Sequence, residues 1–72
     1  MRYTLQQVED ILFDGTRGQM DALADADNPA PLSYAITGTD MTIRVGEDVA
    51  SYHGLSEAPA CAEVFGPSRV FK

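Results

Sequence analysis

The sequence predicts an α+β domain: two N-terminal helices packed on a small antiparallel three-stranded sheet, with a short C-terminal helix and a candidate edge strand. Two observations support this class. In the first third of the chain apolar residues recur every three or four positions, as on one face of a helix; from Leu32 they alternate with small or polar residues, as in a strand. Because domains typically contain about 100–150 residues, a chain of 72 residues is expected to form a single domain, residues 1–72.

The first predicted helix covers residues 4–14. Thr4 and Gln7 form a capping-box pattern, in which the two side chains accept hydrogen bonds from backbone N–H groups at the start of the helix. The apolar residues that follow share one face of the helix: Leu5, Val8, Ile11 and Leu12. Gly15 is expected to end the helix in the left-handed conformation that is common at helix C-termini.

A second helix is predicted from Arg17 to Asp25. Thr16 and Gln19 repeat the capping-box spacing. The helix then presents a narrow apolar stripe: Met20, Leu23 and Ala24. The segment 27–31, which contains two prolines, is expected to end this helix, because proline lacks a backbone N–H donor and disfavours helix in the residue before it.

The middle of the chain is predicted to form a three-stranded meander. Its first two strands are marked by alternating apolar residues: Leu32, Tyr34 and Ile36, then Met41, Ile43 and Val45. The segment Gly38-Thr39-Asp40 suits a short hairpin connection between them. Residues 49–53 follow a turn-like segment, and we expect them to form the third strand, with a short helix as the alternative.

The C-terminal part is predicted to contain a short helix and an edge strand. Ser56 is expected to cap a helix that runs through Phe65. Gly66 and Pro67 are expected to stop this helix, because glycine adopts the left-handed conformation and proline cannot continue a helix. Residues 69–72 are then the candidate edge strand.

The composition is acidic and limits the classes of function. The chain has 11 acidic and 5 basic residues, a net charge of −6, and these scattered bases argue against direct binding of nucleic acid. No apolar run approaches the ~18 residues that span a bilayer, and the first residues lack a secretory pattern, so a cytoplasmic protein without membrane contact is expected. The one cysteine, Cys61, excludes an internal disulfide and most structural zinc sites.

Carboxylates are concentrated in the two predicted helices and just after them, where Arg17 is the only base. These candidate partner-binding residues are Glu9, Asp10, Asp14, Asp21, Asp25 and Asp27. Residues four apart on a helix are about 6 Å apart, a separation close to that of successive phosphates along one nucleic-acid strand. Such a face suits a partner that grips phosphates, although like charges at this spacing cost roughly 0.2–0.5 kcal/mol per pair. The alternative is a solvated face that keeps the protein soluble.

No constellation of catalytic or ligand-binding residues is recognised, and we expect no enzymatic activity, cofactor or metal. The segment 25–28 begins like a calcium loop, but a proline and an alanine follow, and position twelve is Ile36 rather than glutamate. Cys61 lies between two alanines, a context in which cysteine behaves as a small hydrophobe. Its spacing from His53 gives no evidence of a catalytic pair.

In small size, acidity and lack of motifs, the chain resembles phage-encoded inhibitors of bacterial defence, including anti-CRISPR proteins. No residue motif carries the resemblance, so it assigns no functional residue. It implies a module that docks on a basic surface of a larger protein, a nucleic-acid-binding effector complex for example, and blocks it. The alternative is a self-associating or scaffold domain that uses the apolar sheet face and the C-terminal edge strand, and a small enzyme ranks third. A monomer or weak homodimer is expected.

Overall fold

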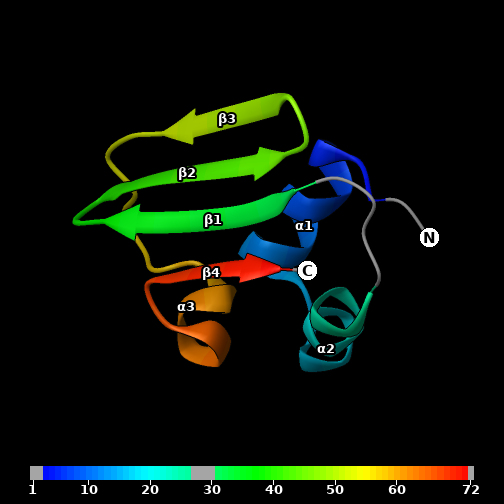
Figure 1. Cartoon of the computed structure of the whole chain (residues 1–72). Helices are drawn as coiled ribbons and strands as arrows, with labels where there is room; N and C mark the ends of the chain where they lie inside the picture. Colours follow the sequence, from blue (N-terminus) through cyan, green and yellow to red (C-terminus); the bar gives the residue numbers. More distant parts are fainter. Residues whose placement is uncertain (1–2, 27–30, 72) are drawn as a thin grey trace.

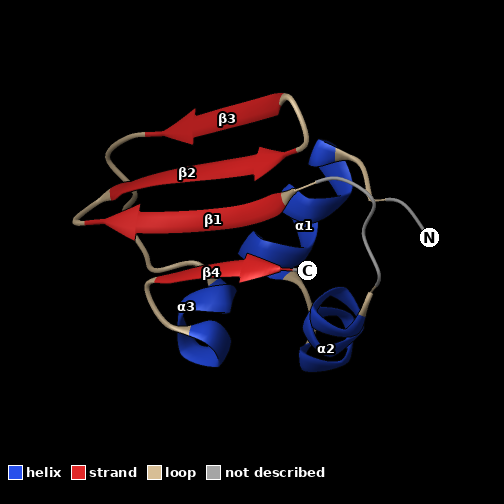
Figure 2. Cartoon of the chain, viewed as in Figure 1, coloured by secondary structure: helices blue, strands red, loops and turns tan. Residues whose placement is uncertain are grey.

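The computed structural model describes residues 3–26 and 31–71. Its elements in chain order are α1 (Leu5–Asp14), α2 (Arg17–Asp25), β1 (Leu32–Thr37), β2 (Asp40–Val45), β3 (Asp48–Tyr52), α3 (Ala60–Phe65) and β4 (Ser68–Phe71). The strands form one antiparallel sheet in the order β3-β2-β1-β4 (Figures 1 and 2). The predicted α+β class is confirmed, and the candidate edge strand is present as the fourth strand, paired with β1.

The helices cover one face of the sheet and leave the other face open (Figure 1). The helix α1 contacts β2 and β3, α3 contacts β4, and α2 packs against α1 and α3. The core between the layers consists of ten buried residues: Val8, Leu12, Met20, Leu23, Leu32, Tyr34, Met41, Ile43, Cys61 and Phe71. No helix in the described parts of the chain has the length and apolarity needed to cross a membrane.

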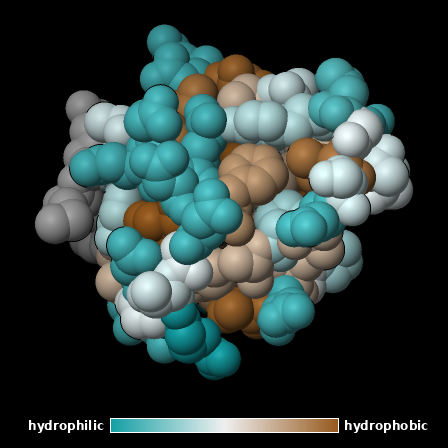
Figure 3. Space-filling model, turned by 180° about the vertical axis from the view of Figure 1, so that it is seen from behind, coloured by the Kyte–Doolittle hydropathy of each residue, from teal (hydrophilic) through white to brown (hydrophobic). Residues whose placement is uncertain are grey.

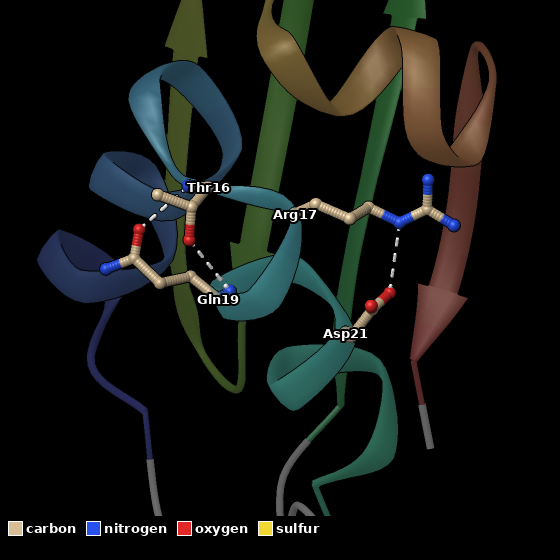
Figure 4. A network of polar contacts seen from close by, with 4 residues as sticks. All are labelled: Thr16, Arg17, Gln19 and Asp21. Atoms are coloured by element: carbon tan, nitrogen blue, oxygen red, sulfur yellow. Dashed lines mark hydrogen bonds and ion pairs between the residues drawn. The ribbon is translucent and has the colours of Figure 1, made fainter.

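Both predicted capping boxes are present. The Thr4 hydroxyl accepts a hydrogen bond from the Gln7 backbone N–H at 3.2 Å, and the Gln7 side-chain oxygen accepts one from the Thr4 N–H at 2.9 Å. Thr16 and Gln19 repeat this arrangement at 3.2 and 2.8 Å (Figure 4). A cap of this kind contributes about 1 kcal/mol, so local chemistry fixes where each helix begins.

The end of α1 differs from the prediction. Gly15 does not adopt a left-handed conformation; its φ of −71° and ψ of 162° are extended. Its N–H donates to the Ile11 carbonyl at 2.9 Å, and a Cβ at Gly15 would lie 2.8 Å from the Ile11 Cα and closer still to its carbonyl oxygen. Glycine is therefore needed because the chain passes close to the last turn of α1.

The sheet follows the predicted alternation. Thr37 pairs with Asp40, so the β1–β2 hairpin has a two-residue turn, and Gly38 takes the positive φ of 61° that this turn requires. The segment 49–53 is not a helix: Asp48–Tyr52 is β3, and its Ala50 pairs with Ile43 of β2. The strand interpretation of this segment is confirmed and the helical alternative is wrong.

The helix α3 starts later than predicted. Ser56 does not cap it; Pro59 is the N-cap residue, with an extended ψ of 153°. Because proline disfavours helix in the residue before it, Ala58 cannot belong to the helix, and the helix begins at Ala60. Its predicted end is confirmed at Gly66, whose φ is 87°.

Candidate functional site

The helix α1 presents two of the predicted carboxylates on its outer side. Val8 and Leu12 are completely buried. Asp10 and Asp14 lie about half a turn away from them, because each residue advances the helix by about 100°, and both are exposed. The Gln6 side-chain amide donates to Asp10 at 3.3 Å. The outer side of α1 therefore carries two carboxylates four residues apart.

The helix α2 repeats this pattern with one difference. Met20 and Leu23 are buried, and Asp21 and Asp25 are exposed on the opposite side. The Arg17 guanidinium lies 3.3 Å from the Asp21 carboxylate, and the two side chains are 74% and 58% exposed (Figure 4). An exposed pair of this kind contributes little, but it partly neutralises Asp21. The sixth predicted residue, Asp27, lies outside the described residues.

Two of these carboxylates occupy unfavourable positions. Asp14 is the last residue of α1 and Asp25 is the last residue of α2. The C-terminus of a helix carries a partial negative charge, so a carboxylate there costs about 0.3–1 kcal/mol. Neither helix has an acidic residue in its first turn, where a carboxylate would stabilise it, or a basic residue in its last turn. The carboxylates at the ends of α1 and α2 therefore destabilise both helices.

Glu9 has different surroundings from the other carboxylates. It is half-buried, and its carboxylate lies beside the Tyr52 hydroxyl of β3. This hydroxyl is buried and makes no hydrogen bond of good geometry with the described residues. The Phe13 ring packs edge-on against the Tyr52 ring, and the two ring centres are 4.8 Å apart. Burial, and then the Glu9 carboxylate, raises the pKa of Tyr52 above its ordinary value. Glu9 thus belongs to the contact between α1 and β3.

The basic side chains are dispersed. Residues 3–26 and 31–71 contain ten acidic side chains but only three basic ones. These are Arg17 on α2, Arg44 on β2 and Arg69 on β4. The Arg69 guanidinium stacks 4.7 Å from the Phe65 ring centre and 5.3 Å from that of Phe71. Seen from the helical side, hydrophilic residues spread over much of the surface, with hydrophobic residues between them (Figure 3). The electrostatic potential of this protein is therefore dominated by carboxylates.

The lone cysteine and the lone histidine lie in different environments. Cys61 is completely buried in α3 and unpaired, and burial raises the pKa of its thiol. The His53 ring nitrogen Nδ1 lies 3.3 Å from the Asp40 carboxylate, and its side chain is 78% exposed. The prediction that Cys61 behaves as a small hydrophobe is confirmed. In the described residues no group of three or more potential metal ligands comes together.

The open face of the sheet is the surface that the sequence did not single out. The apolar face, which the scaffold alternative assigned to self-association, is covered by the helices. The residues on the open face are mostly small or polar: Ser33, Ala35, Thr42, Arg44, Ser51 and Ser68. Val49 on β3 and Val70 on β4, exposed by 48% and 75%, flank them. Strand order brings these positions together, and no local pattern reveals that order.

Comparisons of the chain with family models, with curated proteins and with solved structures gave no match in any of the three. Function therefore has to be inferred from the surfaces of this chain. Three of them are distinctive: the acidic outer sides of α1 and α2, the open face of the sheet, and an apolar pocket beside the β1–β2 hairpin.

Proposed function

We propose that the chain is an acidic protein-interaction module. It docks through the outer sides of α1 and α2 on a basic surface of a larger protein and inhibits that protein by occupying its nucleic-acid-binding surface. One observation carries the proposal: two helices that pack against each other both expose carboxylate pairs, Asp10 with Asp14 and Asp21 with Asp25, at positions that destabilise the helices.

The spacing of the charges supports mimicry of a phosphate backbone. Each pair places the Cβ atoms of two aspartates about 6 Å apart on one side of a helix. A protein that binds a nucleic acid neutralises its phosphates with lysine and arginine side chains. Complementary charge of this kind mainly accelerates association, and the acceleration falls as salt is added. The inhibitory role and the effector-complex partner rest on the general likeness to small acidic phage inhibitors such as anti-CRISPR proteins.

The test compares two charge-matched variants as baits in an extract of the cells that express the chain. The first variant replaces the four exposed carboxylates of the helices by lysine: Asp10→Lys, Asp14→Lys, Asp21→Lys and Asp25→Lys. The second reverses four exposed carboxylates elsewhere: Asp40→Lys, Glu47→Lys, Asp48→Lys and Glu63→Lys. The wild type and the second variant are expected to retain a basic protein that the first variant loses, and salt should release it.

The inhibitory part has its own readout. The retained protein is purified, and its binding to a labelled nucleic acid is measured with increasing amounts of each chain. The wild type and the second variant should displace the nucleic acid, and the first variant should not. Equal retention by both variants at low salt would contradict the assignment to α1 and α2, and retention without displacement would contradict the inhibitory role.

A self-associating scaffold is the second candidate, favoured by the exposure of Val70. This residue lies on the edge strand β4 and is 75% exposed. Association through it would be apolar and would persist in high salt, whereas docking led by charge weakens. Light scattering across a salt series separates the two candidates, because only self-association gives a dimer that survives at about 1 M salt.

A further inference from the structure

An apolar pocket of about 430 Å³ lies beside the β1–β2 hairpin. Its walls come from three segments that are distant in sequence: the end of the hairpin, the loop 55–59, and the segment from α3 to Pro67. In Figure 1 this loop runs from β3 behind the hairpin to α3. The aliphatic part of the lining consists of Ile36, Leu55, Ala58, Pro59, Ala62 and Pro67. The volume falls within the range of about 300–1,000 Å³ that is typical of ligand pockets.

Hydrogen bonds between the walls hold the pocket open in a fixed shape. The Leu55 N–H donates to the Thr39 carbonyl at 2.9 Å, which ties the loop to the hairpin. The Ile36 N–H donates to the Pro67 carbonyl at 2.7 Å, which ties β1 to the segment after α3. The Tyr34 hydroxyl donates to the Gly66 carbonyl at 2.6 Å. A preformed site costs less ordering entropy when a ligand binds.

The charge of the pocket indicates its occupant. Glu57 is the only charged residue in the described lining. The whole chain has a net charge of −6, so a second copy would be repelled, whereas a basic segment would be attracted. We infer that the pocket receives an apolar side chain from a basic peptide segment of the partner. This inference rests on the proposed function, because the pocket would bind a second part of the same basic partner that docks on α1 and α2.

The expected gain in affinity follows from the apolar area that the pocket covers. A leucine side chain has more apolar surface than an alanine side chain, so its burial in the pocket contributes more to the affinity. Because this pocket is open on one side, the burial is partial, and the gain corresponds to about a tenfold change in affinity. A basic peptide with a central leucine should therefore bind about tenfold more tightly than the same peptide with a central alanine.

The experiment titrates three synthetic peptides into the isotope-labelled chain and follows the backbone amide signals by NMR. The first peptide has a central leucine flanked by three lysines on each side, the second has alanine in its place, and the third has leucine flanked by glutamates. The leucine–lysine peptide should shift the amides of Thr39, Leu55 and Ala62. The alanine peptide should need about ten times the concentration for the same shifts, and the glutamate peptide should not bind.

Two pairs of variants test the pocket itself. Ala62→Leu fills it from α3, and Ala35→Leu makes the same change on the open face of the sheet, away from the pocket and the acidic helices, as the control. Glu57→Lys reverses the charge of the lining, and Glu47→Lys reverses an exposed charge in the β2–β3 turn. Ala62→Leu should remove the preference for leucine over alanine. Glu57→Lys should weaken binding of the leucine–lysine peptide about fivefold more than Glu47→Lys. If Ala62→Leu does not fold, this charge variant still tests the pocket.

The outcomes separate this inference from the proposed function. If both lysine peptides shift the amides of Asp10, Asp14, Asp21 and Asp25 equally and leave the pocket unchanged, the inference is wrong and the proposed function stands. If neither lysine peptide shifts any amide, both fail. Binding of the glutamate peptide in the pocket, or shifts that depend on protein concentration without peptide, would show an occupant other than a basic segment and overturn the inference.

Discussion

Replacement of Asp14 and Asp25 by lysine should stabilise the folded chain and weaken its binding to a basic partner. Both carboxylates are exposed at the last position of a helix, and each has a second carboxylate four residues before it. The substitution reverses two unfavourable interactions at each site, one with the helix dipole and one with Asp10 or Asp21. Stability and binding should therefore change in opposite directions.

At each site the gain in stability is the sum of a helix-dipole contribution and a side-chain pair contribution. Removal of a carboxylate from a helix C-terminus relieves at least about 0.3 kcal/mol, and a lysine there adds a similar gain. The pair four residues apart changes from repulsive to attractive, at about 0.2 kcal/mol for each change. Each site then gives about 1 kcal/mol and the double variant about 2 kcal/mol. In a domain of this size this raises the melting temperature by about 8–16 °C.

The assay is urea unfolding, followed by circular dichroism, at low salt and at about 1 M NaCl. The matched control, Glu47→Lys with Asp48→Lys, changes the net charge equally but lies at the β2–β3 turn, away from any helix end. The helix variant should exceed the control in stability at low salt, and the difference should shrink in high salt because exposed charges are screened. A helix variant no more stable than the control would refute the electrostatic reasoning.

Three further predictions concern the interior. Cys61→Ala should remain folded and keep partner binding, and the wild-type thiol should react with a thiol reagent only as fast as the chain unfolds, because Cys61 is completely buried and burial raises its pKa. The free energy of unfolding should fall as the pH rises above 10, because burial raises the pKa values of Tyr34 and Tyr52 above 10.0 and the unfolded chain loses these protons first; urea midpoints across this range measure the effect. Gly15→Ala should lower the melting temperature, measured calorimetrically, because its Cβ would press on the Ile11 backbone.

The starts of α1 and α2 could be predicted from the sequence because a capping box is a local device. Thr4 and Gln7 between them satisfy two backbone N–H groups at the start of α1, and Thr16 and Gln19 do the same for α2. The alternation of β1 and β2 is equally local, since its period of two residues directly gives the side of the sheet on which each residue lies.

The errors arose where a conformation depends on contacts rather than on residue type. Gly15 follows the usual pattern of a left-handed stop, but its role is set by the approach of its backbone to Ile11. Ser56 is a good capping residue, but Pro59 decides where α3 begins. In the sequence Glu9 is indistinguishable from the surface carboxylates, and only the packing of α1 against β3 places it beside Tyr52. The pocket is likewise invisible in the sequence, because three distant segments form it.

The position of the carboxylates, rather than their number, argues against a role in solubility alone. Solubility depends on net charge, and the same charge could stand in the first turns of α1 and α2, where it would stabilise the helix dipoles. Both first turns lack an acidic residue. A small domain is stable by roughly 0.05–0.15 kcal/mol per residue, so the cost of the carboxylates at the two helix ends, about 1 kcal/mol, is an appreciable fraction of its total.

A redistributed variant tests this argument at constant net charge. Gln7→Glu and Gln19→Glu keep both capping boxes, because glutamate serves at that position as well as glutamine, and Asp14→Gln with Asp25→Gln removes the carboxylates from the helix ends. The variant should be as soluble as the wild type and more stable in urea, because the new charges lie at the positive ends of the helix dipoles. Its association with the basic partner should be slower, measured by stopped flow at low salt. Association as fast as that of the wild type would mean that net charge alone attracts the partner.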